Sequence, residues 1–305
     1  MSTYTSLFGN ALKLLIKLLA KAPLGVRSRL GRLAGFIFSL IPTKDRRIAK
    51  LQLEVFARGQ GGGAAVGRVY ASLGQTLLES INLKPILRRP ELYIECPCRD
   101  EIDRLVLQKK PIVALTAHTG NWDLLAAYIV SLGIPLTTAG RVARNQHFQQ
   151  ILAEIRAGYG VKTIWRADRG GGKGLINDLR EHRVVAALID QDTRVTSVFA
   201  PFFNKPVKTP SALISLGKKF NTLFVSAFMF RLGLNRYRVY VEEIDGALSV
   251  EQIATIFNQR LEHYLRTYPD QWVWMHKRWR TSPEHGTMSS TQYLEFLKKV
   301  VTSFA

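Results

Sequence analysis

Residues 112–117 read IVALTA, and residues 118–123, which follow at once, read HTGNWD. The first stretch is almost wholly apolar, as expected for a central strand of a parallel sheet that is covered on both faces. Gly120 permits a tight turn after this strand, and a helix is predicted from Trp122 to Leu132 with Asn121 as its N-cap. Strand, turn and helix together predict an α/β domain.

Similar alternation continues towards the C-terminus. Strands are predicted at residues 136–138, 161–165, 184–189, 223–230 and 237–241, and helices at 146–159, 173–181, 211–220, 249–268 and 287–303. Strands that alternate with helices indicate βαβ units, so we expect an α/β fold with a largely parallel central sheet flanked by helices. Residues 1–83 have only helical periodicity, which divides the chain into a helical region, 1–83, and an α/β domain, 84–305.

The composition excludes several classes of protein. A chain of 305 residues with 47% hydrophobic and 22% charged residues has enough apolar side chains for a core, which excludes disorder throughout. Two cysteines, Cys96 and Cys98, exclude a disulfide framework and favour a reducing compartment. The net charge of +20 favours encounter with an anionic membrane, a nucleic acid or an acidic protein.

Much of this positive charge lies near the N-terminus. Lys13, Lys17 and Lys21 share one face of a predicted helix whose other face is apolar, and a second basic helix is expected to end at Pro42. The longest uncharged run in this region, the eleven residues between Arg32 and Lys44, is shorter than the roughly 20 residues that span a bilayer. Either these helices pack on the domain with their basic side chains in water, or residues 1–42 dock at an anionic membrane surface; we favour docking.

His118 and Asp123 are the predicted catalytic residues. His118 comes at the carboxyl end of the predicted central strand, where ligands gather in open α/β sheets. An imidazole there can take a proton from a hydroxyl, and a carboxylate on its other ring nitrogen fixes the tautomer. We expect the turn to bring Asp123 to His118; the alternative is a hydrogen-bonding pair without catalytic function in an ordinary loop.

Other polar residues are expected near the same edge. Asp190, Gln191 and Asp192 follow the predicted strand at 184–189. Two carboxylates are compatible with a metal, but there is no third ligand cluster, so no metal is predicted and hydrogen bonds to loop amides are expected. Arg169 precedes three glycines and a helix, an arrangement that can cradle a phosphate although it lacks P-loop spacing.

The motifs together resemble a known family. Residues 118–123 resemble the HxxxxD/E motif of the glycerolipid acyltransferases, and the Gly-Asn-Trp inside it is similar to the late acyltransferases of lipid A biosynthesis, which add lauroyl or myristoyl chains. Residues 190–192 (DQD), 198–203 (VFAPFF) and 268–279 (YPDQWVWMHKRW) are similar to later blocks of that family. The resemblance covers roughly residues 92–286 and implies a glycerol-3-phosphate acyltransferase-like fold.

The resemblance also implies an activity. It implies transfer of a fatty acyl chain from a thioester of acyl carrier protein, or of CoA, to a hydroxyl of a lipid A precursor, with no other cofactor. Acyl carrier protein, which is acidic, and anionic membrane lipids are the implied partners, at the cytoplasmic face of the inner membrane. Arg141 and Arg166 are implied to lie near a phosphate of the substrate. Phe202 and Phe203 are expected to wall an acyl-chain channel, unless they belong to the core.

Alternative functions follow from the same features. The acceptor is equally compatible with an ornithine lipid, a lysophospholipid or a phosphatidylinositol mannoside. A protein without enzymatic activity that binds nucleic acid or a membrane would also fit the charge of +20 and the basic aromatic stretch 272–280. Because no helix-turn-helix, RNA-binding or zinc pattern accompanies this stretch, no nucleic-acid partner is predicted. The sequence does not give the oligomeric state.

Overall fold

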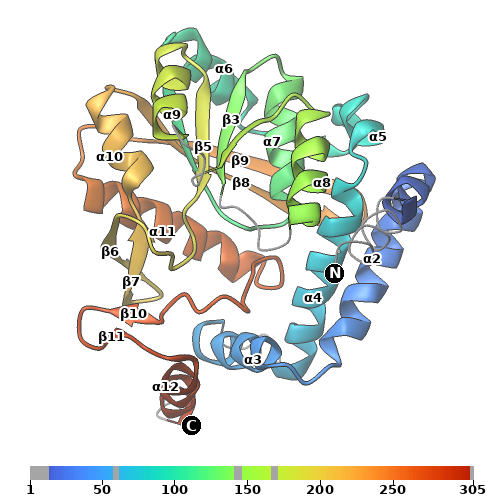
Figure 1. Cartoon of the computed structure of the whole chain (residues 1–305), viewed down its shortest axis with the longest axis vertical. Helices are drawn as coiled ribbons and strands as arrows, with labels where there is room; N and C mark the ends of the chain where they lie inside the picture. The colour runs from blue at the N-terminus through green and yellow to red at the C-terminus, as the bar shows by residue number, and fades with distance from the viewer. Residues whose placement is uncertain (1–13, 58–61, 141–145, 166–170, 303–305) are drawn as a thin grey trace.

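The central sheet contains seven strands in the order β1-β9-β8-β2-β5-β3-β4, so that β2 lies in the middle. Figure 1 marks β3, β5, β8 and β9 of this sheet. The computed structural model describes residues 14–57, 62–140, 146–165 and 171–302. The strands of the sheet are β1 (Ile94–Glu95), β2 (Ile112–Thr116), β3 (Leu136–Gly140), β4 (Lys162–Trp165), β5 (Val184–Leu188), β8 (Leu223–Gly233) and β9 (Arg236–Ile244). Each predicted strand is present, with ends that differ by up to three residues.

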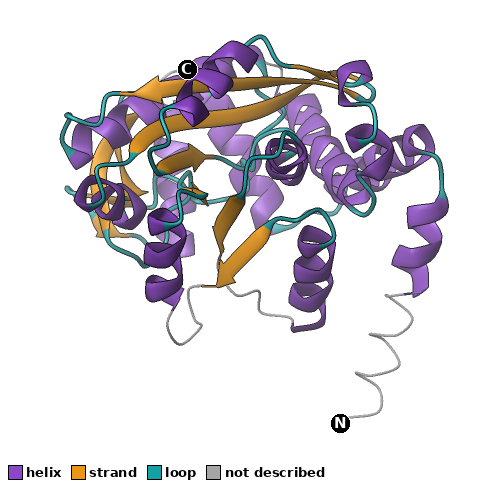
Figure 2. Ribbon diagram, turned by 90° about the horizontal axis from the view of Figure 1, so that it is seen from above, coloured by secondary structure: helices purple, strands orange, loops and turns teal. Residues whose placement is uncertain are grey.

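The pairing within this sheet is largely parallel. β2 pairs in parallel with β5 and with β8, and β3 pairs in parallel with β5 and β4. The long strands β8 and β9 form the antiparallel pair, side by side in Figure 2, and the chain reverses between them at Asn235, whose φ of 59° is left-handed. Parallel pairing is what βα units impose. The predicted α/β class, with a largely parallel sheet flanked by helices, is therefore confirmed.

Helices cover both faces of the sheet. They are α2 (Leu24–Ser39), α3 (Lys44–Phe56), α4 (Gly62–Ser80), α5 (Lys84–Leu87), α6 (Arg99–Leu107), α7 (Trp122–Ser131), α8 (Gln146–Ala157), α9 (Gly171–Arg180), α10 (Ala212–Lys219), α11 (Val250–Thr267) and α12 (Ser290–Thr302). Ile112 and Ala114 of β2 share a hydrophobic cluster with α6 and α7, whereas Val113 and Leu115 share another with α10 and α11. β2 is buried on both faces, as predicted.

Several elements were not predicted from the sequence, among them α6 and a β-hairpin. α6 has the charged sequence RDEIDRLVL, and only Ile102 and Leu105 of it are buried. β6 (Ser197–Phe202) and β7 (Lys205–Pro210) form a hairpin outside the main sheet, against α11. Phe203 and Asn204 connect the two strands with φ values of 48° and 57°, as in a two-residue hairpin turn. The three prolines of the hairpin, Pro201, Pro206 and Pro210, concealed its strands, because proline is disfavoured in strands.

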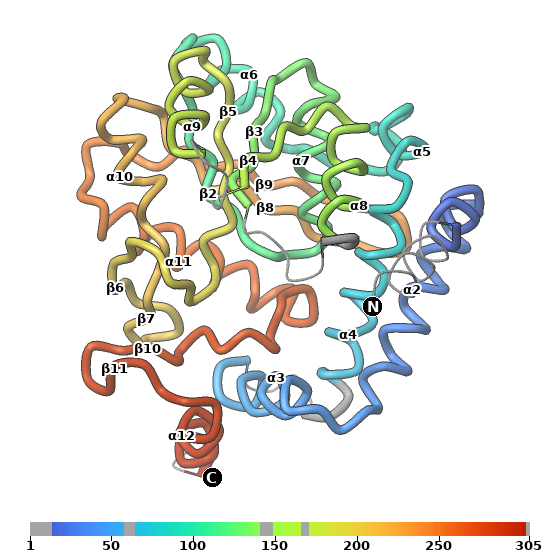
Figure 3. Tube along the Cα trace, viewed as in Figure 1, coloured from blue at the N-terminus to red at the C-terminus, as the bar shows by residue number. Residues whose placement is uncertain are grey.

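The N-terminal helices pack on each other and on the α/β domain. α2 lies along α4 (Figure 3), and the contact is close because a Cβ on Gly35 would stand 2.0 Å from the carbonyl oxygen of Tyr70. α3 contacts α12, and residues of α3 and α4 belong to the same hydrophobic cluster as α11. The division at residue 83 therefore stays a prediction. Among the described residues, none of the helices is both long enough and apolar enough to cross a membrane.

One predicted basic residue of α2 is not at the surface. Arg27 is fully buried, and its guanidinium donates to the carbonyl oxygens of Ala22, Leu78, Glu79 and Asn82. The expectation that the arginines of the second helix all face water or lipid is wrong for Arg27. It is wrong because the end of α4 leaves carbonyl groups without helical partners, and the guanidinium satisfies two of them.

Candidate active site

His118 lies directly beyond the carboxyl end of β2 and is paired with Asp190. Its ring Nδ1 stands 2.9 Å from Asp190 Oδ1, and its backbone N–H donates to Asp190 Oδ2 at 3.0 Å. Asp190 follows β5, the strand beside β2, so the two residues meet because two parallel strands end at the same edge. The His118 side chain is 26% exposed, whereas that of Asp190 is fully buried.

Asp190 is held in its ionised form. Burial alone would raise the pKa of this carboxyl, but the charge of His118 and hydrogen bonds from His118 and Trp272 lower the pKa to about 2. The indole Nε1 of Trp272 donates to Asp190 Oδ2 at 2.8 Å. An ionised carboxylate only accepts hydrogen bonds, so Nδ1 of the imidazole carries the proton. In the neutral imidazole Nε2 is then the nitrogen without a proton, as a general base requires.

The predicted pairing of His118 with Asp123 is wrong. Asp123 lies in the first turn of α7, where its Oδ1 accepts from Nε of Arg156 on α8 at 2.8 Å. Helix α7 begins so soon after the turn that this carboxylate is carried towards α8, and Asp190 takes the Nδ1 position instead. Trp122 is the residue of the motif whose ring meets the imidazole, edge-on at 5.1 Å between centroids.

The turn between His118 and α7 is built as the sequence predicts. Asn121 caps the helix, because its Oδ1 accepts from the backbone N–H of Leu124 at 2.9 Å. Gly120 has a φ of 50°, and a Cβ there would lie 2.2 Å from the carbonyl oxygen of Met229. A side chain at position 120 is excluded by this clash, and the left-handed conformation also favours glycine.

An apolar cavity lies along one face of the sheet, between the sheet and helices α6 and α7. Its lining includes Trp122, whose ring meets the His118 imidazole, and also Asp123 and Arg156. The residues of β2 that line the cavity run from Thr116 to Ile112, a length of about 13 Å at the usual rise of a strand. The sheet residues that line it include Ile112, Ala114, Thr116, Leu136, Thr138, Val184, Ala186, Leu188, Val225 and Ala227.

Phe202 and Phe203 belong to other surroundings. Phe202 is buried and packs against Trp279 and Trp272, with ring centroids at 5.4 and 5.6 Å. Phe203 lines a different cavity, together with Phe56 of α3. Neither phenylalanine lines the cavity beside Trp122, because the β6–β7 hairpin directs them into the cluster of tryptophans, and their role as walls of an acyl-chain channel stays a prediction. Core packing, the alternative, describes Phe202.

Of the remaining predicted site residues, the structure describes some and not others. Asp192 is buried and accepts from Thr281 Oγ1 at 2.6 Å, and Gln191 lies between Asp190 and Asp192 at the sheet edge. Arg141, Arg166 and Arg169 lie outside the described residues. Within the part of the chain that the structure describes, no three His, Cys, Asp or Glu side chains gather as metal ligands do.

The stretch 272–280 does not form a basic aromatic surface. Trp272, Trp274 and Trp279 are at most 2% exposed, and Arg278 is fully buried. Arg278 donates to the carbonyl oxygen of Lys208 and to the side chains of Thr209 and Asn258. The feature that suggested nucleic-acid binding is therefore part of the core.

Three residues near the turn were missed in the sequence. Trp272 was noted only as part of a motif, although its indole holds Asp190. Glu79 and Arg231 form a buried ion pair behind the turn, with Arg231 Nη2 and Glu79 Oε2 2.7 Å apart. Glu79 left a signal, because it is the only acidic residue between Glu54 and Glu91 and falls on a predicted amphipathic helix. An isolated carboxylate in such a stretch indicates a specific buried partner.

Comparisons with known proteins agree on one family. A family model described as bacterial lipid A biosynthesis acyltransferase matches residues 3–281. The lipid A biosynthesis palmitoleoyltransferase of Escherichia coli (strain K12) is 25% identical over 60% of this chain and 60% of its own length. The phosphatidylinositol mannoside acyltransferase of Mycobacterium tuberculosis (strain CDC 1551 / Oshkosh) is 21% identical over 59% of this chain and 58% of its own.

A third relative extends the match. The lipid A biosynthesis acyltransferase of Haemophilus influenzae (strain ATCC 51907 / DSM 11121 / KW20 / Rd) is 23% identical over 72% of this chain and 67% of its own length. The chain spans about 60% of the length of the Escherichia coli relative.

Proposed function

Because the chain belongs to the bacterial lipid A biosynthesis acyltransferase family, we propose that it transfers a fatty acyl chain from a thioester to a hydroxyl group of a membrane lipid. The observation that carries this proposal is the His118–Asp190 pair beside Trp122, whose ring meets the imidazole and lines an apolar cavity. A base that removes a proton from an alcohol and a slot that accepts a hydrocarbon chain are the two parts that the reaction needs.

The geometry supports direct attack by the acceptor. Nε2 of His118 takes the proton of the acceptor hydroxyl while its oxygen attacks the thioester carbonyl, and the ionised Asp190 stabilises the imidazolium that forms. The tetrahedral intermediate then expels the thiolate, which takes the proton from Nε2 as the ester forms. Helix α7 starts four residues after His118, and its first N–H groups are suited to stabilise the oxyanion.

The apolar cavity supports a place for the acyl chain. Small side chains leave the middle of the cavity open, where Ala114 is paired in register with Ala186, whereas Ile112 and Val184 are paired farther from His118. With the thioester carbon at His118, the hydrocarbon would lie over the alanines and end near Ile112. The cavity depth would then select the length of the chain.

Two substitutions in β2 test this placement of the chain. We expect Ala114→Leu to lower kcat/KM about tenfold or more for the longest accepted donor but not for short ones, because each excluded methylene loses its site. Ile112→Ala, at the far end, is expected to shift the preference towards longer chains. Competition among acyl donors of increasing length measures both, and unchanged preferences in both variants would contradict the placement.

The N-terminal helices support docking at a membrane. Eleven large apolar side chains within residues 14–41 are exposed: Leu14, Leu15, Leu18, Val26, Leu30, Leu33, Phe36, Ile37, Phe38, Leu40 and Ile41. Arg29 and Arg32 lie among them and are exposed too. Exposed apolar residues interleaved with basic ones suit the interface of an anionic bilayer. We therefore propose attachment at the cytoplasmic face of the inner membrane through residues 14–41.

Charge substitutions on α2 test membrane docking. Leu33→Glu combined with Ile37→Glu is expected to weaken binding to vesicles that contain phosphatidylglycerol by at least about tenfold, because each side chain contributes roughly 1.5–3 kcal/mol when buried. The control is Leu107→Glu on α6, where an equally apolar side chain is 77% exposed. Co-sedimentation measures binding; an equal loss in both variants would argue against docking through α2.

The acceptor and donor complete the proposal. The names of the relatives specify lipid A or phosphatidylinositol mannoside, so we propose a glycolipid hydroxyl as acceptor, with a lipid A precursor first and an ornithine lipid or a lysophospholipid as alternatives. The donor is an acyl carrier protein or CoA thioester, and the charge of +20 suits the acidic carrier.

Mass spectrometry of lipids from cells with and without the gene tests the proposed acceptor. A lipid that lacks one acyl chain is expected without the gene, and identical lipid profiles would contradict the proposal.

A further inference from the structure

A buried ion pair stands behind the turn that follows His118. Glu79 of α4 is 0% exposed and Arg231 of β8 is 6% exposed in their side chains. Burial would raise the pKa of Glu79, but Arg231 and hydrogen bonds to the carboxylate, including one from Gln75, keep the pKa below its usual value. Burying two charges is costly unless each is well paired, so such a pair calls for a reason.

The carboxylate of Glu79 is fully occupied by hydrogen-bond donors. Oε1 accepts from Gln75 Nε2 at 2.6 Å and from Ser28 Oγ of α2 at 3.0 Å. Oε2 accepts from Arg231 Nη2 at 2.7 Å and from Asn121 Nδ2 at 3.1 Å. Glu79 thus holds the side chain whose other end caps α7, and it does so from the far side of the turn.

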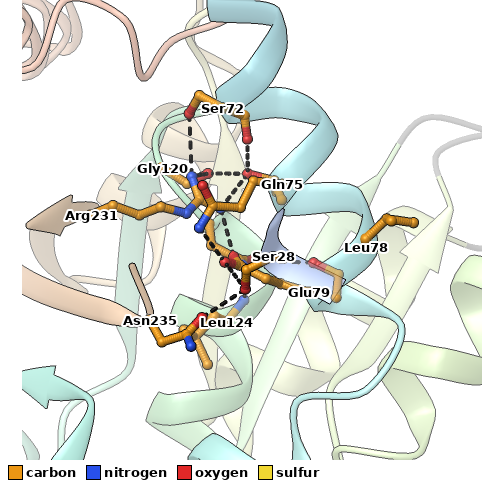
Figure 4. A network of polar contacts seen from close by, with 12 residues as sticks. Ser28, Ser72, Gln75, Leu78, Glu79, Gly120, Leu124, Arg231 and Asn235 are labelled. Carbon is orange, nitrogen blue, oxygen red and sulfur yellow. Dashed lines mark hydrogen bonds and ion pairs between the residues drawn. The ribbon is translucent and has the colours of Figure 1, made fainter. Parts of the chain in front are cut away.

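Arg231 and Thr76 hold the neighbouring residue of the turn. The carbonyl oxygen of Gly120 accepts from Arg231 Nη1 at 3.2 Å, and both residues are labelled in Figure 4. The same oxygen accepts from Thr76 Oγ1 at 2.6 Å. Arg231 Nη2 also donates to Thr76 Oγ1 at 2.7 Å. Both sides of the peptide bond between Gly120 and Asn121 are therefore tied to the same buried pair.

The buried ion pair restrains the backbone at Gly120, which a glycine alone would leave flexible. Position 120 must be glycine to clear Met229, yet glycine is the residue with the widest backbone freedom. A planar peptide whose carbonyl is fixed has its N–H fixed on the opposite side. The pair thus sets the direction in which the chain leaves His118 and the place where the first N–H groups of α7 stand.

We propose that Glu79 and Arg231 are positioning residues, which lock the Gly120–Asn121 peptide so that His118 and the start of α7 face the substrate together. The inference rests on the proposed acyl transfer. Neither residue touches the reacting atoms in this proposal; both act through Gly120 and Asn121. Losing the lock should therefore slow the chemical step more than it weakens substrate binding.

Glu79→Gln and a matched control test the proposal. Asp178→Asn is the control, because Asp178 is also buried and paired with a basic residue, Lys162, but it lies in the last turn of α9, which leads to the amino end of β5. We expect Glu79→Gln to lower kcat about 10- to 100-fold with KM within about twofold, and Asp178→Asn to leave kcat within about twofold even where both lower the Tm alike. Equal kcat in the two variants would overturn the proposal.

A milder variant keeps the test valid if Glu79→Gln does not fold. Thr76→Val removes the 2.6 Å hydroxyl donor to Gly120 without exposing a buried charge, and Thr76→Ser retains it. We expect a several-fold loss of kcat for valine and rescue by serine, whereas equal values for the two would overturn the proposal. Hydrogen–deuterium exchange of residues 117–125 should be faster in Thr76→Val and in Glu79→Gln than in the unmodified protein.

The exchange measurement separates this inference from the proposed function. If the unmodified chain transfers no acyl group, the proposed function fails. Faster exchange at residues 117–125 in the Glu79 and Thr76 variants, and not in Asp178→Asn, would still support the lock. Unchanged exchange there would overturn it, whatever the activity.

Discussion

Replacing His118 with alanine is expected to lower kcat for acyl transfer by about 10²- to 10⁴-fold, the range that a positioned general base contributes. The fold should survive, because the side chain is 26% exposed and projects from the end of β2. KM should change little, because in the proposed mechanism the cavity, and not the imidazole, holds the acyl chain. Steady-state kinetics with an acyl thioester donor measure both constants.

The control for His118→Ala is a histidine away from the sheet edge. The His285 side chain is 52% exposed and contacts Glu284, so His285→Ala should leave kcat unchanged. Thermal unfolding of both variants checks that any loss at His118 is not a loss of folded protein. Near-normal turnover in folded His118→Ala would refute the general-base mechanism.

The local part of the fold was predictable from the sequence. The apolar run at 112–117, the glycine at 120 and the N-cap at Asn121 each determine structure through neighbours a few residues away. The structure places a strand, a left-handed turn and a helix there. Short-range steric and hydrogen-bonding rules suffice for such a segment.

The partner of His118 was not predictable in the same way. Asp123 was chosen because it is close in sequence, whereas Asp190 is 72 residues away. Their contact depends on β5 lying next to β2, and hydrophobic periodicity does not determine the order of parallel strands. Sequence placed both residues at the same edge of the sheet, but only the strand order shows which carboxylate reaches the ring.

The cavity was missed for a different reason. The phenylalanines drew attention because bulky aromatic side chains suggest walls, yet the space beside His118 exists because Ala114, Ala186 and Ala227 are small. A lack of side-chain volume becomes visible only when three strands bring their alanines to one face. Phe202 instead fills the core near the tryptophans, and Phe203 lines a different cavity.

Asp190→Asn is expected to lower kcat by about 10²- to 10⁴-fold, because the amide keeps the shape but not the charge of the carboxylate. An amide can donate to Nδ1, which moves the imidazole proton to Nε2 and removes the base. It also cannot stabilise the imidazolium. Kinetics and thermal unfolding of the variant measure the effect and check the fold.

The pKa of Asp190 also predicts how stability depends on pH. A carboxyl whose pKa falls from 3.8 to about 2 on folding stabilises the native state at pH values above about 4, and this contribution is lost as the pH falls towards 2. The shift corresponds to roughly 2 kcal/mol. Asp190→Asn should therefore be less stable than the unmodified protein at neutral pH and lose less stability on acidification.

The tautomer of His118 shows which carboxylate, Asp190 or Asp123, orients the imidazole. Asp123→Asn disturbs the contact with Arg156, so its effect on activity alone does not identify the carboxylate that orients the ring. Nitrogen NMR of the imidazole does. We expect the proton on Nδ1 in the unmodified protein and in Asp123→Asn, and on Nε2 in Asp190→Asn. The reverse result would assign the orienting carboxylate to Asp123, because the residue that accepts the Nδ1 proton determines which nitrogen is left to act as the base.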